Sequence, residues 1–471
     1  MLEASSPKSL HDWLSSLLSC NFAADDPITA CGRPALDVLQ YSPNEAIRLA
    51  HEKLHTFHYS QVPTSWRRLF EEASLQKARL ILEHASPDVA RYRYSPGRPH
   101  QFEQKRLEDE NPHPQKDWIT ELVQVLDKAA IISGVPKRGD VIHELMLGLE
   151  EFLSTTPYNC SDDSELRVKR RKIDPSTSYT KASDPSGKEL AIRVKHTPSL
   201  QRPISRQKAP SLHEFQQHLD KPTVTPLVIT HALDHWPALN DPARQWSNAD
   251  YLLRKTLGGR RLVPVEFGRS YTDAGWSQRI VTFAEFLQQC LLRDQSAADN
   301  VSDTDTSIGY LAQHDLFSQI PPLRADISIP DYCYSTPPAP DNPPDLDEPL
   351  VNAWFGPGGT ISPLHTDPYH NIFCQVVGYK YLRLYAPDQT PKLYPRGNDD
   401  QGIDMSNTSQ VDVKQFELQS PSQSQDAFPL FREANYVECV LGPGECLYVP
   451  RGWWHYVESL STSFSVSFWW N

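Results

Sequence analysis

The first 155 residues carry apolar positions at the spacing that one face of an α-helix requires. The pattern is clearest at 117–133, where Asp117 can cap the start and Gly134 and Pro136 follow the end. Weaker patterns of the same kind predict helices at 11–18, 44–54, 64–80 and 140–153. No cluster of catalytic side chains accompanies them, so residues 1–155 are expected to form a helical scaffold or interaction domain.

The helical pattern is absent from residues 156–195, where Ser, Asp, Thr and Pro dominate and apolar residues are sparse. Such a composition is typical of a disordered linker. A basic run at 167–172 lies inside this segment. In an accessible segment the run is typical of a nuclear localisation signal, which an import receptor binds, and the alternative is a solvated charge run.

From residue 196 to residue 471 the pattern changes to alternating apolar and polar positions, with frequent Trp and Tyr. Strands are expected at 224–229 and 261–267, and one helix at 283–292. After Ala353, short strands alternate with Pro and Gly turns, which predicts an all-β barrel or sandwich. The whole chain is therefore expected to be of the α+β class, with a β-rich domain at 196–471 after the helices.

Composition and charge narrow the class of function. The 471 residues hold 46 Lys and Arg against 59 Asp and Glu, a formal net charge of −13. An acidic chain disfavours direct nucleic-acid binding and favours basic protein or peptide partners that contain Arg or Lys. No apolar run is long enough to predict a membrane span, and the start of the chain lacks the pattern of a secretory signal.

The eight cysteines include no C-x-x-C pair, which disfavours a zinc ribbon or a thioredoxin-like site. They are expected to be reduced thiols of an intracellular protein. Together with the basic run, this predicts that the protein is located in the nucleus, with a further pool in the cytoplasm.

The candidate chemistry lies near the C-terminus. His365 and Asp367 are two positions apart, and residues at i and i+2 point to the same side of a strand. His455 follows a turn, a short strand and a second turn, at the predicted start of another strand. On facing strands of a small barrel, the two His and one Asp would form a triad that holds Fe(II) and leaves one face of the metal open. The alternative is two unrelated histidines and a capping Asp.

A lysine in the segment 379–385 suggests an anion-binding position. Alternation places Lys380, Leu382 and Leu384 on one face of a predicted strand. A lysine on an apolar face is costly to bury unless an anion pairs with it, and a bound dicarboxylate would supply this charge. The alternative is an edge-strand lysine whose ammonium group reaches water.

The final predicted strand, 463–470, has one bulky apolar face and one face with Ser463, Ser465 and Ser467. Three small hydroxyl side chains that point into a barrel would leave the space that a ligand cavity needs. The alternative is a strand that is half exposed to solvent.

These motifs resemble the jumonji-C (JmjC) branch of the Fe(II)- and 2-oxoglutarate-dependent oxygenases, a cupin-like family with a double-stranded β-helix (jelly-roll) fold. The resemblance covers about residues 210–471 and is much weaker over the helical part. It implies that 196–471 is a catalytic JmjC domain. The segments that carry it are 271–273 with Trp276, 310–314, 326–333, 352–357, 360–365, 407–413 and 464–470.

The resemblance implies Fe(II) as the cofactor, with 2-oxoglutarate and O₂ as co-substrates. By motif, His365, Asp367 and His455 resemble the metal ligands at the catalytic centre. Lys380 resembles the residue that pairs with the distal carboxylate of 2-oxoglutarate. The full set of co-substrate contacts that the resemblance implies is Tyr310, Ser362, Asn371, Lys380 and Trp469.

The residues that resemble the substrate side of this family are Glu266, Trp276 and Trp354. An acidic group beside an indole can hold a guanidinium group by charge and stacking. Tyr369 and His370 depart from the family's pattern close to the metal ligands, and could alter the choice of substrate.

The favoured function is the hydroxylation of a side-chain carbon of an arginyl residue in a protein substrate. The first alternative is N-methyl-lysine demethylation on histones, in which the hydroxylated methyl group leaves as formaldehyde. The alternative of another class is a non-catalytic cupin that serves as a protein-interaction module.

Overall fold

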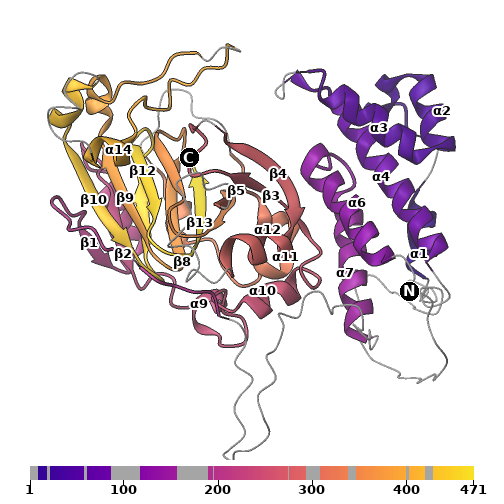
Figure 1. Ribbon diagram of the computed structural model, residues 1–471, viewed down its shortest axis with the longest axis horizontal. Helices are drawn as coiled ribbons and strands as arrows, with labels where there is room; N and C mark the ends of the chain where they lie inside the picture. Colours follow the sequence, from indigo (N-terminus) through magenta and orange to yellow (C-terminus); the bar gives the residue numbers. More distant parts are fainter. Residues whose placement is uncertain are drawn as a thin grey trace, which may run out of the picture. The chain divides into compact units, whose positions relative to one another are not determined.

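The computed structural model describes residues 9–18, 22–57, 61–85, 117–155, 189–194, 196–273, 275–292, 308–337, 346–398, 402–418 and 428–471. Contacts divide the chain into two compact units, Met1–Pro185 with Arg260–Leu262, and Ser186–Gly259 with Val263–Asn471 (Figure 1). The basic run and most of the expected linker lie outside the described residues. Among the helices that are described, none is long and apolar enough to cross a membrane.

The first unit is helical, as the apolar periodicity predicts. The Asp117 carboxylate accepts a hydrogen bond from the Thr120 backbone N–H at 3.1 Å and caps α6. Gly134 ends this helix in the left-handed conformation with φ of 67°, which a residue without Cβ adopts at little cost. The helices are α1 (Leu10–Leu17), α2 (Arg33–Tyr41), α3 (Pro43–Leu54), α4 (Thr64–His84), α6 (Trp118–Ser133) and α7 (Gly139–Thr155), with a 3₁₀ helix η1 at Pro27–Cys31.

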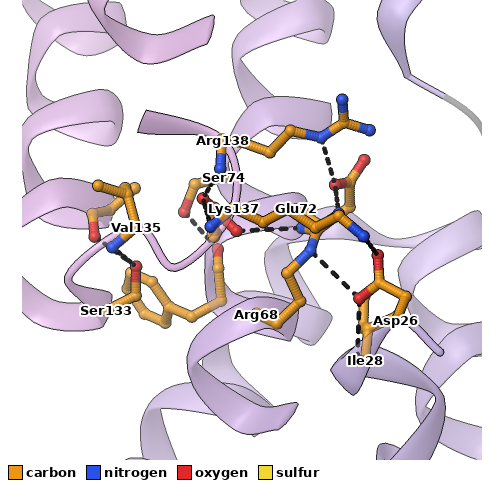
Figure 2. Close-up of polar contacts among 12 residues, drawn as sticks. Asp26, Ile28, Arg68, Glu72, Ser74, Ser133, Val135, Lys137 and Arg138 are labelled. Atoms are coloured by element: carbon orange, nitrogen blue, oxygen red, sulfur yellow. Dashed lines mark hydrogen bonds and ion pairs between the residues drawn. The ribbon is translucent and has the colours of Figure 1, made fainter. Parts of the chain in front are cut away.

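An ionic cluster lies in the interior of the first unit, around α4. The Arg68 side chain is 1% exposed, and its guanidinium lies 3.4 Å from Asp26, 3.2 Å from Glu71 and 2.6 Å from Glu72. Lys137, in the turn before α7, approaches Asp26 from a half-exposed position at 3.0 Å (Figure 2). Because the three carboxylates share one buried guanidinium, the packing of α4 against its neighbours depends on Arg68.

The second unit contains two facing β-sheets (Figure 1). In the described part of the chain, the larger sheet has the strand order β1-β2-β11-β8-β13-β6-β5-β3-β4 and the smaller one β10-β9-β12-β7. Between β6 and β13 the chain crosses repeatedly from one sheet to the other, and strands β6, β8 and β13 pair antiparallel. This topology confirms the cupin-like double-stranded β-helix after a helical region.

The strands of the larger sheet are β1 (Arg206–Lys208), β2 (Leu227–Thr230), β3 (Leu262–Phe267), β4 (Ser277–Thr282), β5 (Gly309–His314), β6 (Leu350–Gly356), β8 (His370–Val377), β11 (Cys446–Val449) and β13 (Ser463–Trp470). Those of the smaller sheet are β7 (Ile361–His365), β9 (Lys380–Tyr385), β10 (Tyr436–Leu441) and β12 (Trp454–Ser459). The strands expected at 224–229 and 261–267 correspond to β2 and β3.

Short helices connect the strands of the second unit. The helix expected at 283–292 starts as α11 and continues as a π-helical turn, η4 at Leu287–Leu291. The helices are α8 (Leu212–Leu219), α9 (Pro237–Asn240), α10 (Ala249–Lys255), α11 (Phe283–Phe286), α12 (Leu316–Gln319), α13 (Pro321–Arg324) and α14 (Val413–Leu418). The 3₁₀ helices are η6 (Asp331–Tyr334), η7 (Pro387–Lys392) and η8 (Pro429–Glu433).

The two faces of β13 have different surroundings. Its bulky residues belong to a large apolar core that also contains side chains from the helices. On the other face, Ser463 and Ser465 bond to the amide of Gln375 at 2.9 and 2.7 Å, and Ser467 accepts a hydrogen bond from Trp354 at 2.9 Å. The serines point into the barrel, as expected, but Gln375 and Trp354 occupy the space beside them. The prediction that they line the ligand cavity is therefore wrong.

The second unit starts earlier than expected from the composition. Leu190 is 4% exposed within the large core, and its N–H donates to the Ser247 carbonyl at 2.8 Å. Contacts therefore place the boundary after Pro185, whereas the expected linker extends to residue 195. A single buried leucine inside a polar stretch does not change its average composition, which explains the difference.

Candidate active site

The three expected metal ligands converge at one end of the smaller sheet. His365 is the last residue of β7, and His455 is the second residue of β12, directly opposite it in the strand pairing. Asp367 lies two residues beyond the end of β7, so strand alternation alone does not place it. The candidate ligand atoms of the three residues all lie within 4.8 Å of one another.

The two imidazoles are oriented by the backbone. Nδ1–H of His365 donates to the Pro363 carbonyl at 2.7 Å, and Nδ1–H of His455 donates to the Trp453 carbonyl at 3.0 Å. Both Nε2 atoms therefore lack a proton in the neutral rings and point toward Asp367, at 3.7 Å and 3.4 Å from its carboxylate oxygens. Two imidazole nitrogens and one carboxylate oxygen form the donor set that non-haem Fe(II) prefers.

Burial and mutual contact perturb the protonation of this group. Burial, helped by the neighbouring His455, lowers the pKa of His365 to about 4. For His455, burial also opposes the charged form, but the Asp367 carboxylate outweighs it and raises the pKa. For Asp367, burial opposes ionisation, and the two histidines outweigh it and lower the pKa. An ionised carboxylate between two imidazoles is an arrangement that a divalent cation would complete.

The three candidate ligands line a pocket that lies between the two sheets. Most of the expected co-substrate contacts line it, together with Trp354. Trp469 does not, although it pairs in register with Asn371, which does. The full lining is Tyr310, Trp354, Ser362, His365, Asp367, Asn371, Phe373, Lys380, Leu382, Val449, His455 and Val457.

Lys380 is completely buried in this pocket. Its ammonium group donates a hydrogen bond to the Tyr310 hydroxyl at 2.9 Å and lies 5.2 Å from the centre of the Phe373 ring. No carboxylate pairs with it among the residues that the structure describes. Burial lowers the pKa of Lys380 to about 7. A buried cation without a counter-charge suits an anionic ligand.

A second buried polar group in the pocket also lacks a partner. Asn371 is 4% exposed, and its side-chain Oδ1 accepts no hydrogen bond from any residue that the structure describes. Because burying an amide oxygen without a donor is costly, a ligand is the natural source of this bond. The charge of Lys380 and the three-ligand set together fit a metal ion with a bound keto diacid, whose oxygens would accept a hydrogen bond from the Asn371 NH₂ group.

The aromatic residues divide between the pocket and its surroundings. Trp354 lines the pocket, 6.1 Å from the ring centre of Tyr310. Trp469 is buried, its Nε1 has no hydrogen-bond partner within the described ranges, and its ring stacks on Tyr369 with centroids 5.7 Å apart. Tyr369 is one of the two departures from the family's pattern. It contacts Trp469, which pairs in register with the pocket residue Asn371. His370 instead bonds to the Tyr448 hydroxyl at 2.9 Å.

Glu266 and Trp276 lie together but outside the pocket's lining. Nε1 of Trp276 donates to the Glu266 carboxylate at 3.2 Å. Glu266 pairs in register with Tyr310, which lines the pocket. Burial raises the pKa of Glu266, and Trp276 partly offsets this effect. No Lys or Arg pairs with Glu266 in the described segments.

Two residues near the site were given no role in the site from the sequence. Phe373 lines the pocket and follows Asn371 on the same face of β8, so strand alternation could have identified it. Tyr271 lies within electrostatic reach of both Asp367 and Glu266, and burial together with these carboxylates raises its pKa. It comes from a turn before β4, where no periodic pattern predicts the direction of a side chain.

Known proteins share this domain. The family model described as a cupin-like domain matches residues 212–471 of this chain. The lysine-specific demethylase 8 of Danio rerio is 34% identical over 450 residues, which are 95% of this chain and 89% of that protein. The protein of the same name from Xenopus tropicalis is 44% identical over 295 residues, 61% of this chain and 58% of that protein.

A more distant relative carries a different activity in its name. The bifunctional peptidase and (3S)-lysyl hydroxylase JMJD7 of Homo sapiens is 25% identical over 255 residues, which are 52% of this chain and 77% of that protein. Relatives with this domain are thus named both for demethylation and for hydroxylation.

Proposed function

This chain belongs to the cupin-like JmjC family of 2-oxoglutarate-dependent oxygenases, and we propose that it hydroxylates a side-chain carbon of an arginyl residue in a protein substrate. The family in general uses Fe(II) and 2-oxoglutarate. In the proposal His365, Asp367 and His455 hold the iron, whose chemistry couples the oxidative decarboxylation of 2-oxoglutarate by O₂ to the oxidation of a C–H bond.

The chain's own residues would bind and orient the reactants. Lys380 would pair with the distal carboxylate of 2-oxoglutarate, and Tyr310 would fix the ammonium group through the hydrogen bond that is already present. Asn371 would donate a hydrogen bond from its side-chain NH₂ group to an oxygen of 2-oxoglutarate. Apolar side chains such as Phe373 would exclude water around the ligand.

One observation supports an arginyl target. Glu266 is a partly buried carboxylate beside the pocket without a cationic partner in the described segments, and Trp276 holds it by a hydrogen bond. A guanidinium group from the substrate would supply the missing charge and could stack on the indole face. Lysine would supply the charge but not the planar stacking.

The second candidate is N-methyl-lysine demethylation on histones. The names of the relatives from Danio rerio and Xenopus tropicalis favour it, and a nuclear location mediated by the run at 167–172 would suit it. The substrate would still be a basic segment, which the net charge of −13 favours. The two candidates therefore differ in the target group and share the site.

Mass spectrometry of peptides after incubation with the full chain, Fe(II) and 2-oxoglutarate tests the proposal. We expect Arg peptides to gain the mass of one oxygen atom with release of succinate. Loss of a CH₂ mass from N-methyl-lysine peptides, with formaldehyde, would instead establish demethylation. Absence of succinate release with any peptide would leave only the interaction-module alternative.

Two variants locate the activity. Asp367→Ala is expected to abolish iron binding and succinate release together, since two imidazoles alone form an incomplete site. Glu266→Gln is expected to raise KM for the Arg peptide at least about tenfold while it retains iron binding. Trp276→Phe, which keeps the aromatic face and loses the hydrogen bond, serves as the milder comparison. An unchanged KM in Glu266→Gln would exclude Glu266 as the guanidinium partner.

A further inference from the structure

Strand β4 is unusually exposed for a strand of this barrel. Gln278, Arg279 and Ile280 are all exposed, whereas every residue of β8 and β13 is buried. In the described part of the chain, β4 is the terminal strand of the larger sheet and neighbours β3. Its outward side chains are therefore available for contact with another molecule.

The directions of the side chains on β4 follow from contacts at both faces. Trp276, directly before the strand, points toward Glu266 on β3. The guanidinium of Arg279 lies 4.5 Å from the ring centre of Phe267, and Phe267 belongs to the apolar core on the opposite face of β3. By alternation, Gln278 and Ile280 point to the same face as Trp276 and Glu266.

We call Trp276, Gln278 and Ile280 the β4 row. Its two apolar members are each 37% exposed, and they are among the few large apolar side chains that are exposed in the described residues. A polar glutamine separates them, so the row is an alternation of apolar and polar contacts. Such a row matches the side chains of one extended peptide rather than a lipid surface.

The row begins at the edge of the active site. Glu266 pairs in register with Tyr310, whose hydroxyl holds Lys380 inside the pocket. Tyr271 lies within electrostatic reach of both Glu266 and the metal-ligand candidate Asp367. If Glu266 binds one residue of a substrate peptide, the residues that precede or follow it in the peptide would lie beside β4, because β4 neighbours β3.

We propose that the β4 row is a docking surface for the substrate polypeptide, on which Ile280 contacts an apolar side chain about four residues away from the residue held by Glu266. The inference rests on the proposed function in taking a polypeptide as the substrate. Trp276 and Ile280 are about 13 Å apart along an extended strand, and a peptide that runs beside β4 has the same rise per residue. Ile280 thus selects an apolar residue at that spacing.

Binding of labelled peptides to the full chain tests this surface. Mn(II) replaces Fe(II) and N-oxalylglycine replaces 2-oxoglutarate, so that the peptides bind without being oxidised. The probes are short peptides with a central arginine that carry either Leu or Ser about four positions before and after it. The native protein is expected to bind a Leu peptide about tenfold more tightly than the matching Ser peptide. Absence of any Leu preference would overturn the proposal.

The variants assign the preference to one residue. Ile280→Ser is expected to weaken binding of the Leu peptides about tenfold and to leave the Ser peptides unchanged, whereas Ile280→Leu keeps the preference. Arg279→Gln, on the opposite face of the same strand, is the matched control and is expected to keep the preference too. An equal loss for Leu and Ser peptides in Ile280→Ser, with an unchanged melting temperature, would overturn the proposal.

Two further outcomes distinguish this inference from the proposed function and from a dimer interface. If peptides bind with the Leu preference but gain no oxygen on turnover, the proposed function fails and the docking surface stands. If native protein sediments as a dimer and Ile280→Ser as a monomer, the row is an interface between two copies of this chain, and the docking proposal is overturned.

Discussion

At the scale of single residues, the environment of Lys380 strongly disfavours its charged form. Its ammonium group has a tyrosine hydroxyl and two aromatic rings around it, and burial lowers its pKa to about 7. A bound dicarboxylate would favour the charged form and raise this pKa. Ligand affinity is therefore linked to the proton on Lys380.

The sign of the linkage determines the pH dependence. Affinity for 2-oxoglutarate is expected to be highest below about pH 7, where Lys380 is charged before binding, and to fall by up to about tenfold per unit as pH rises above that value. Calorimetry with Mn(II) between about pH 6.5 and 8.5 measures it. Lys380→Arg stays charged over this range, so its affinity should not change with pH. The same slope in both proteins would exclude Lys380 as the titrating group.

At the scale of secondary-structure elements, α4 depends on one buried guanidinium. Arg68 is surrounded by Asp26, Glu71 and Glu72, and burial raises the pKa of Glu71 in spite of Arg68. Without the guanidinium, the three carboxylates would face one another in a medium where charge is costly. Such a cluster stabilises only while it is complete.

Arg68→Met should therefore destabilise the first unit by about 3–5 kcal/mol. Native-state hydrogen exchange of the α4 amides in the full chain measures the local free energy of unfolding. Arg79→Met on the same helix removes a largely exposed ion pair with Glu83 and should cost less than about 1 kcal/mol. Comparable losses in the two variants would contradict a special role for the buried cluster.

At the scale of the whole molecule, net charge governs the encounter with a substrate. A chain of charge −13 attracts cationic segments over distances of about one Debye length, roughly 10 Å at 0.1 M salt. This attraction is independent of the contacts made inside the pocket. It would act on Arg and Lys substrates alike.

The association rate of an Arg-rich peptide should therefore fall several-fold between about 0.05 and 0.3 M salt, while the rate for a peptide with Gln in place of Arg should change little. Stopped-flow fluorescence with both peptides provides the measurement. A rate for the Arg-rich peptide that does not respond to salt would mean that local contacts alone determine capture.

The helices and the β-rich second part were predictable because their signals are local. Asp117 and Gly134 mark the two ends of α6, and two short motifs contain the three candidate ligands that the fold brings together. Strand order was not predictable, because pairings such as Glu266 with Tyr310 join residues that are far apart in sequence. The role of the β13 serines was misjudged for the same reason, since Gln375 and Trp354 come from other strands.

The hydrogen bonds from His365 and His455 to carbonyl groups two residues earlier have a consequence for the protein when no metal is bound. Because the main chain orients both rings, the two imidazole nitrogens are expected to keep their positions when no metal is bound. Under the proposed function, protein that has lost its metal would therefore need little rearrangement of its histidines before it takes up another ion.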